Sequence, residues 1–125
     1  METKSAKIEN CKIAKASIEF YNGCSLTAWI TVVGDGWGCG FGGFAFDEPP
    51  RKVNGEFKGE RRGSAYGTEC IARIMRVFEV EHWEDLNGLN CRVETGGIGY
   101  GINKIGHIYK DKWFSFVEVA KEYQC

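Results

Sequence analysis

Polar and hydrophobic residues alternate through the first third of the chain, a pattern typical of β-strands. Residues 5–20, 25–33 and 37–46 each mix β-branched or aromatic residues with charged or small ones. Asn22-Gly23 separates the first two segments, and this dipeptide readily adopts the positive φ angles that a tight hairpin turn requires. A second glycine-rich turn precedes the third segment. The pattern therefore predicts three consecutive strands in an antiparallel meander.

The pattern changes to a helical period between residues 64 and 80. Hydrophobic residues there are spaced i, i+3, i+4 and i+7, which places them on one face of an α-helix. They are Ile71, Ile74, Met75 and Phe78. Ser64 stands at the N-cap position, where its hydroxyl can accept a hydrogen bond from a free amide of the first turn. We expect one main amphipathic helix in this segment.

The rest of the chain predicts shorter elements. A turn of helix is expected at 82–86, strands at 89–94 and 98–109, and a short terminal helix at 115–123. The order β-β-β-α-β-β-α predicts an α+β fold, with an antiparallel sheet of about five strands. The main helix is expected to pack on one face of that sheet. A chain of 125 residues fits one domain, 1–125.

Glycine takes every second position in two of the predicted strands. These positions are Gly38, Gly40 and Gly42 in one strand and Gly97, Gly99 and Gly101 in the other. Because side chains alternate between the two faces of a strand, one face of each would be bare backbone. Such a face could hold a flat ligand such as a nucleotide, next to Tyr100, or it could receive the helix at 64–80. The second interpretation is favoured, because the helix must bury its hydrophobic face.

Composition and charge narrow the classes of function. The chain has 43% hydrophobic residues and a formal net charge of −1, which suits a globular domain and argues against direct binding to nucleic acid. No hydrophobic run reaches the roughly 20 residues of a membrane-spanning helix, so no membrane association is expected. The first ten residues are polar and lack the hydrophobic segment of a secretory signal. We therefore expect a cytoplasmic protein.

No motif indicates catalysis, a metal or a cofactor. The six cysteines include no Cys-x-x-Cys pair, so a structural zinc site is not expected and the thiols should be free and mostly buried. The two histidines, His82 and His107, have no recognisable nucleophile and acid beside them in the sequence. We expect a protein that is not an enzyme and that needs no cofactor.

The most polar stretch, residues 51–63, is predicted to be a long loop and is the best candidate for binding a partner. The candidate partner-binding residues are Asp47, Glu48, Arg51, Lys52, Lys58, Arg61, Arg62 and Trp113. Nearly balanced charges fit a protein interface, an ordinary solvated loop, or a phosphate site at Arg61-Arg62 beside the helix start. Trp113 could anchor an interface or close the core. The alternative ligand-binding residues are Gly38, Gly40, Gly42, Arg61, Arg62 and Tyr100.

Four phrases of the chain resemble small proteins of phages and prophages, over about residues 25 to 114. They are GFGGF at 40–44, GSAYGTE at 63–69, WEDLNG at 83–88 and IGHIYKDKWF at 105–114. The resemblance brings no assigned functional residues. It implies an anti-defence protein of the anti-CRISPR type, which would bind a bacterial defence protein or ribonucleoprotein complex stoichiometrically in the host cell.

Two other functions stay open. The chain could bind a small ligand and sequester a nucleotide signal. It could also be a structural or regulatory phage protein that associates with itself through the edge strands of its sheet.

Overall fold

The computed structural model describes residues 7–21, 23, 25–50, 52–96 and 101–123 and has an α+β fold, as predicted. Its elements in chain order are β1 (Lys7–Tyr21), β2 (Ser25–Gly34), β3 (Trp37–Ala45), β4 (Asp47–Glu48), β5 (Lys52–Val53), β6 (Glu56–Phe57), β7 (Arg62–Gly63), α1 (Ala65–Phe78), the 3₁₀ helix η1 (Trp83–Leu86), β8 (Asn90–Thr95), β9 (Ile102–His107), β10 (Trp113–Phe114) and α2 (Phe116–Glu122). The meander, the main helix and the short terminal helix are confirmed.

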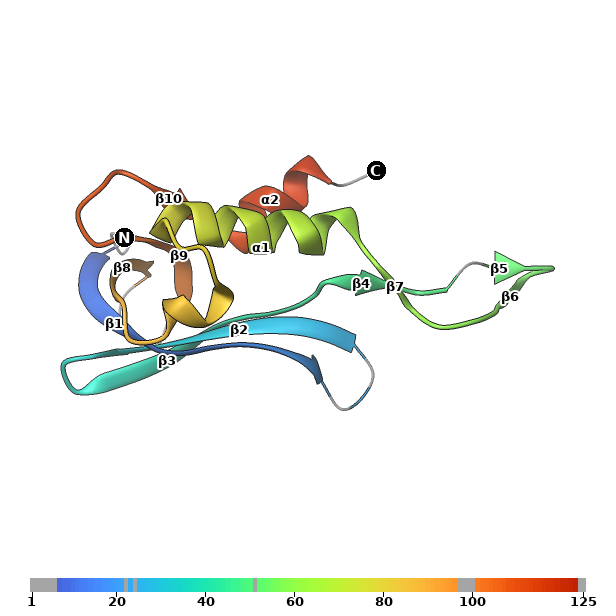
Figure 1. Ribbon diagram of the computed structural model, residues 1–125, viewed down its shortest axis with the longest axis horizontal. Helices are drawn as coiled ribbons and strands as arrows, with labels where there is room; N and C mark the ends of the chain where they lie inside the picture. Colours follow the sequence, from blue (N-terminus) through green and yellow to red (C-terminus); the bar gives the residue numbers. More distant parts are fainter. Residues whose placement is uncertain (1–6, 22, 24, 51, 97–100, 124–125) are drawn as a thin grey trace, which may run out of the picture.

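Six antiparallel strands form the main sheet, in the order β10-β9-β8-β1-β2-β3. The sixth is β10, a two-residue strand that the sequence pattern did not indicate. Strand β1 is long enough to pair with β8 through residues 7–12 and with β2 through residues 12–21. Its register with β2 shifts between Ile13 and Lys15, and such a bulge bends a strand. The sheet is therefore strongly curved (Figure 1), and β3 and β9 approach each other.

Helices α1 and α2 lie over the same side of the sheet and cover the core (Figure 1). Ile13, Ile30 and Ile105 reach the core from three strands, and Ile74 and Phe116 reach it from the two helices. The predicted cap of α1 is confirmed, because the Ser64 hydroxyl accepts a hydrogen bond from the amide of Gly67 at 3.0 Å. The buried face of α1 also includes Cys70 and Val77. It is therefore wider than the predicted hydrophobic face, which did not contain these two residues.

The bare glycine face of β3 does not receive α1, so that prediction is wrong. In the register with β2, Phe41 lies opposite Ile30, and both are buried in the core. Gly40 lies opposite the exposed Thr31, on the other face. A Cβ atom on Gly40 would lie 3.5 Å from the ring of Trp29, and one on Gly43 would collide with that ring.

Gly43 thus makes room for the Trp29 ring of the neighbouring strand, whereas a Cβ atom on Gly40 would only touch that ring. Gly42 has a φ of +129° and lies at a register shift, so it also allows the strand to kink. Gly97 and Gly99, together with Tyr100, lie outside the described residues. None of the helices in the described ranges is long and hydrophobic enough to cross a membrane.

Candidate functional site

Residues 47–63, predicted to be a loop from residue 51 onward, form a narrow two-stranded arm that extends from the body of the domain (Figure 1). Strand β4 pairs with β7 at its root, and β5 pairs with β6 near its tip. Asn54 and Gly55 join β5 to β6 with φ angles of 55° and 81°. Two successive positive φ angles are typical of a type I′ hairpin turn. The loop prediction is therefore wrong, and the Asn54-Gly55 dipeptide was the signal that could have corrected it.

The root of the arm is held by the carboxylate of Asp47, whose side chain is only 6% exposed. This carboxylate accepts hydrogen bonds from Arg61 Nη2 at 3.0 Å, from the Ser25 hydroxyl at 3.0 Å and from the Leu26 amide at 3.1 Å. The Arg61 guanidinium is the main cause that lowers the pKa of Asp47, with smaller contributions from the Leu26 amide and the Ser25 hydroxyl, while burial opposes the shift. The carboxylate therefore ties both strands of the arm to β2.

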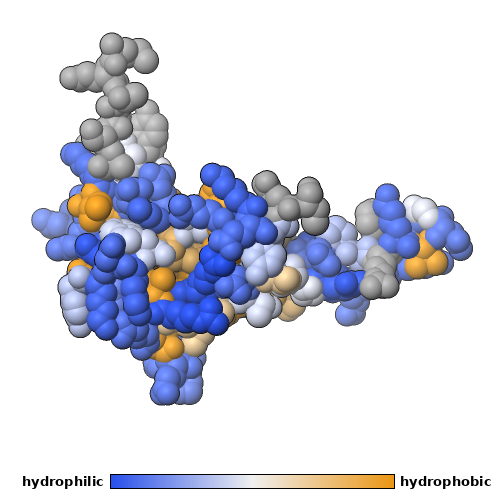
Figure 2. Space-filling model, turned by 90° about the horizontal axis from the view of Figure 1, so that it is seen from above, coloured by the Kyte–Doolittle hydropathy of each residue, from blue (hydrophilic) through white to orange (hydrophobic). Residues whose placement is uncertain are grey.

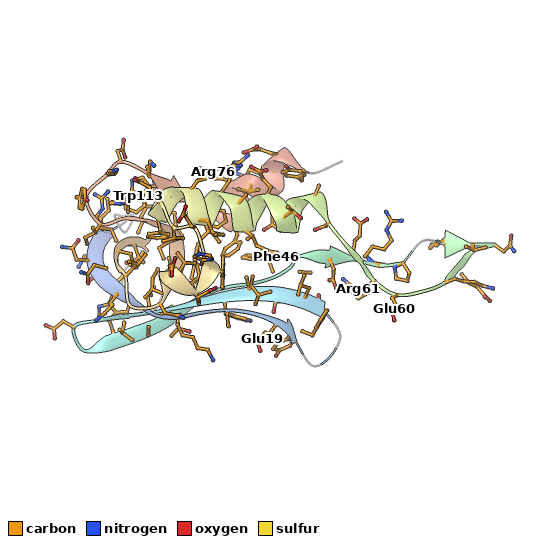
Figure 3. All side chains as sticks on the ribbon, viewed as in Figure 1. Glu19, Phe46, Glu60, Arg61, Arg76 and Trp113 are labelled. Carbon is orange, nitrogen blue, oxygen red and sulfur yellow. The ribbon has the colours of Figure 1, made fainter. Side chains whose placement is uncertain are left out.

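A second set of contacts joins the root of the arm to α1. The carbonyl oxygen of Phe46 accepts hydrogen bonds from the amide and the hydroxyl of Ser64, the N-cap residue. A Cβ atom on Gly67 would lie only 2.5 Å from Cβ of Phe46, so α1 packs directly on this residue. In Figure 3, Phe46 lies beneath α1, whereas Arg61 and Glu60 lie at the root of the arm. The arm thus starts from a rigid part of the core.

Most of the predicted partner-binding residues lie on this arm. They are Asp47, Glu48, Lys52, Lys58, Arg61 and Arg62. Arg51 lies outside the described residues. Figure 2 shows the arm as mainly hydrophilic, with a small hydrophobic spot near its end. Val53 of β5 is 47% exposed there. Among the side chains described at the tip, an exposed hydrophobic one therefore lies among charged ones.

Trp113 is not part of this surface. It lies in β10, at the opposite end of the molecule from the arm (Figure 3). Its ring covers Gly106 and lies 4.7 Å from the Arg92 guanidinium and 5.0 Å from the Lys104 ammonium. Its indole N–H donates to Asp111 at 3.2 Å. These contacts place Trp113 against one face of the sheet, apart from the charged residues of the arm.

The two arginines of the arm that the structure describes, Arg61 and Arg62, already face carboxylates. Arg61 pairs with Asp47, and Arg62 lies 3.6 Å from Glu48. The side chain of Ser64 caps the first turn of α1. A phosphate at this place would have to compete with the carboxylate of Asp47 for the guanidinium of Arg61. The geometry favours a salt-bridged structural role for this pair.

A cavity of about 530 Å³ lies between β3, β9 and the start of α2. Phe41, Phe44 and Phe116 form one wall, with the Phe116 ring centroid 4.8 Å from Phe41 and 5.2 Å from Phe44. Glu94, Lys104 and Glu118 supply its charged groups, and the Lys104 ammonium lies 3.9 Å from the Glu94 carboxylate. Gly40 and Gly42 of the alternative ligand-binding set line this cavity, but Arg61 and Arg62 do not. Sequence reasoning missed the cavity because strand curvature brings its walls together.

The two histidines, His82 and His107, both lie at turns or helix ends of the fold. Nδ1 of His107 accepts hydrogen bonds from the amides of Tyr109 and Lys110, at 3.3 and 3.2 Å, and so stabilises the turn before β10. His82 is exposed and precedes η1 as its N-terminal flanking residue. Within the described ranges, no three His, Cys, Asp or Glu side chains lie close enough together to hold a metal ion.

Comparison with known proteins adds no assignment. No family model, curated protein or solved structure matches the chain.

Proposed function

We propose that this protein is a non-enzymatic inhibitor that binds another protein through its arm. The observation that carries the proposal is the arm itself, built from two ladders of two residue pairs each and projecting from the body of the domain. An isolated two-stranded hairpin is marginally stable in water, so such an arm contributes little to folding. Because the arm contributes little to the stability of the domain, we infer that its role is to contact a partner.

The anchored root supports the same proposal. Asp47, paired with Arg61 and bonded to β2, fixes the direction in which the arm leaves β3, and the Phe46–Ser64 contacts fix it relative to α1. A binding segment that is already oriented loses less conformational entropy when the complex forms. The arm therefore suits stoichiometric binding by a preformed surface.

The charges of the arm favour a protein as the partner. Residues 47–63 contain four acidic and five basic side chains, so the net charge is close to zero. A surface for nucleic acid would carry a clear excess of Lys and Arg. Mixed charges around the exposed Val53 resemble the polar rim and hydrophobic centre of a small protein interface.

The resemblance to phage proteins identifies the partner class to test first. It supports a bacterial defence protein or ribonucleoprotein complex, such as a CRISPR effector, met in the cytoplasm of the host cell. On this proposal the arm would occupy a surface that the effector needs, and the inhibition would require no chemistry.

The experiment is a plating assay in bacterial strains that each carry one active CRISPR effector and a matching phage target. The unmodified protein is expected to restore phage plating in at least one strain. The arm variant Val53→Glu/Lys58→Glu is expected to lose this effect, because it reverses charge and removes the hydrophobic contact at the tip. The control Val33→Glu/Lys15→Glu makes the same changes on exposed residues of β2 and β1 and is expected to behave like the unmodified protein.

Thermal melting of both variants is measured alongside, so that a folding defect is recognised. Failure of the unmodified protein to restore plating in every strain would refute CRISPR inhibition. Restoration by the arm variant at the level of the control would show that another surface binds the partner.

A second candidate function is binding of a small ligand in the cavity between β3, β9 and α2. Lys104 offsets the charge of Glu94, so with Glu118 the charged side chains of the cavity sum to −1. This net charge disfavours the phosphates of a nucleotide, whereas the phenylalanine wall would attract an ammonium group. We therefore propose a cationic ligand for this site in place of a nucleotide. Thermal shift assays with spermidine and with cyclic dinucleotides test this, and a shift caused only by the nucleotides would reverse the proposed ligand class.

A further inference from the structure

Two cysteines face each other where β1 pairs with β8. Cys11 and Cys91 are direct partners in the antiparallel register, and their sulfur atoms lie 3.4 Å apart. Directly opposed residues in antiparallel strands have Cα atoms about 4.5–5.5 Å apart. This separation lies inside the range of about 4.4–6.8 Å found for disulfides. The two backbones therefore need no large movement for a covalent bond between the sulfurs.

We propose that Cys11 and Cys91 form a redox modification site that closes to a disulfide when the protein meets a peroxide. The proposal goes beyond partner binding and does not depend on it. The burial of the pair suits a small oxidant, because Cys11 is 8% exposed and Cys91 is fully buried. A peroxide molecule is small, so the slight exposure of Cys11 suits its approach better than that of a larger oxidant.

Exposure assigns the roles of the two sulfurs, because Cys11 is 8% exposed and Cys91 is 0% exposed, so a peroxide reaches Cys11 first. With the Cys91 thiol as donor, the hydrogen bond between the two sulfurs is the main cause that lowers the pKa of Cys11, while burial opposes it. The same bond, with burial, raises the pKa of Cys91. Because the thiolate is the nucleophile in thiol chemistry, Cys11 is the sulfur that attacks the peroxide.

The reaction balances in two steps. The Cys11 thiolate attacks one oxygen of hydrogen peroxide, the O–O bond breaks, and hydroxide leaves, so that Cys11 becomes a sulfenic acid. Cys91 then loses its proton and attacks the Cys11 sulfur, the S–O bond breaks, and the second hydroxide leaves. Two thiols are oxidised to one disulfide, and one peroxide is reduced to two molecules of water with the two thiol protons.

The other described cysteines serve as internal comparisons. Cys70 is fully buried on the core side of α1, and burial raises the pKa of its thiol to about 11. The thiol of Cys39 is half-buried and donates to the carbonyl oxygen of Gly40 at 3.5 Å. Neither has another cysteine as its register partner in the described strands. We therefore expect oxidation to form one specific bond.

The bond would link residues 80 positions apart and join β1 to β8 in the interior of the sheet. A cross-link that closes so long a loop restricts the unfolded chain strongly. For a domain of this size the expected rise in melting temperature is on the order of 10 °C. Reduction by dithiothreitol should reverse it.

The test treats the full-length protein with hydrogen peroxide, blocks the remaining thiols, digests with trypsin and analyses the peptides by mass spectrometry. Cys11 lies in tryptic peptide 8–12 and Cys91 in peptide 77–92, and each peptide holds a single cysteine. We expect these two peptides joined by a disulfide in the monomer, with the rise in melting temperature described above. The Cys70→Ala variant should still form the disulfide-linked peptides and show the rise in melting temperature. The Cys91→Ala variant should show neither.

Three outcomes would overturn the proposal. Peptide 8–12 could be recovered only as the blocked thiol or as a sulfinic or sulfonic acid. Cys11 could be joined mainly to peptide 16–51, which holds Cys24 and Cys39. The expected pair could occur only in a covalent dimer on a non-reducing gel. Each of these is read from the unmodified protein, so the test does not depend on whether a variant folds.

Discussion

Replacing Asp47 by asparagine removes one charge at the root of the arm and keeps the size of the side chain. The substitution abolishes the ion pair with Arg61 and weakens the hydrogen bonds from the Leu26 amide and the Ser25 hydroxyl. Charge-assisted hydrogen bonds contribute about 1.5–3 kcal/mol each when one partner is removed, and an amide oxygen still accepts part of this set. We expect Asp47→Asn to lower the free energy of unfolding by about 2 kcal/mol at pH 7.

The effect should depend on pH in a defined direction. The folded protein lowers the pKa of Asp47 below its ordinary value of 3.8. A carboxyl with a lowered pKa stabilises the fold above its unfolded pKa, and this stabilisation is lost as the pH falls through the folded pKa. The difference between the two proteins should therefore be constant above about pH 5 and should shrink progressively below the ordinary pKa of 3.8.

Urea unfolding followed by circular dichroism at pH 7, 5 and 3 measures both effects. Glu48→Gln is the matched control, because its pair with Arg62 is 3.6 Å long and both side chains are about half exposed. An exposed pair of this kind contributes about 0–1 kcal/mol. Equal losses for the two variants, or a loss for Asp47→Asn that stays the same at pH 3, would refute the argument that Asp47 anchors the arm.

Two further predictions concern the packing of α1 and the charges at its end. Gly67→Ala should lower the free energy of unfolding by roughly 2 kcal/mol, because the new methyl group would collide with Phe46. Gly63→Ala, where the same methyl group would meet open space, should change stability by less than about 0.5 kcal/mol. Glu79 has its pKa lowered to about 2, first by Lys110. NMR titration of Lys110→Ala should therefore show the Glu79 midpoint rising toward its ordinary 4.5, and an unchanged midpoint would contradict the ion pair.

The elements that the sequence predicted well are those set by local signals. Ser64 and the periodic residues after it define α1, and Asn22-Gly23 separates the two strands that form the first hairpin. The arm was missed although Asn54-Gly55 is the same kind of signal. Each flanking strand is only two residues long, one charged and one hydrophobic, which is too short to display the repeated alternation that identifies a strand.

The orientation of β3 was in principle readable from the same alternation that suggested a groove. If the glycines occupy one face, Phe41 occupies the other, and burying Phe41 yields far more hydrophobic stabilisation than burying bare backbone. The face with Phe41 therefore turns toward the core, where Phe41 packs against Phe116 of α2. The cavity and the Cys11–Cys91 pair have no such local signal, because both arise from contacts between strands that are distant in sequence.

Variants at the tip and at the root of the arm should both weaken binding, but only those at the root should also lower the melting temperature. Substitutions at the tip, such as Val53→Glu, alter the surface that we propose to meet the partner and leave the contacts of Asp47 intact. Asp47→Asn leaves the tip unchanged but loosens the direction in which it is held, so that binding must first order the arm. Tip variants should therefore lose inhibition with an unchanged melting temperature. Asp47→Asn should show both a partial loss of inhibition and a lower melting temperature. Full inhibition by a destabilised Asp47→Asn protein would show that a fixed arm is not required.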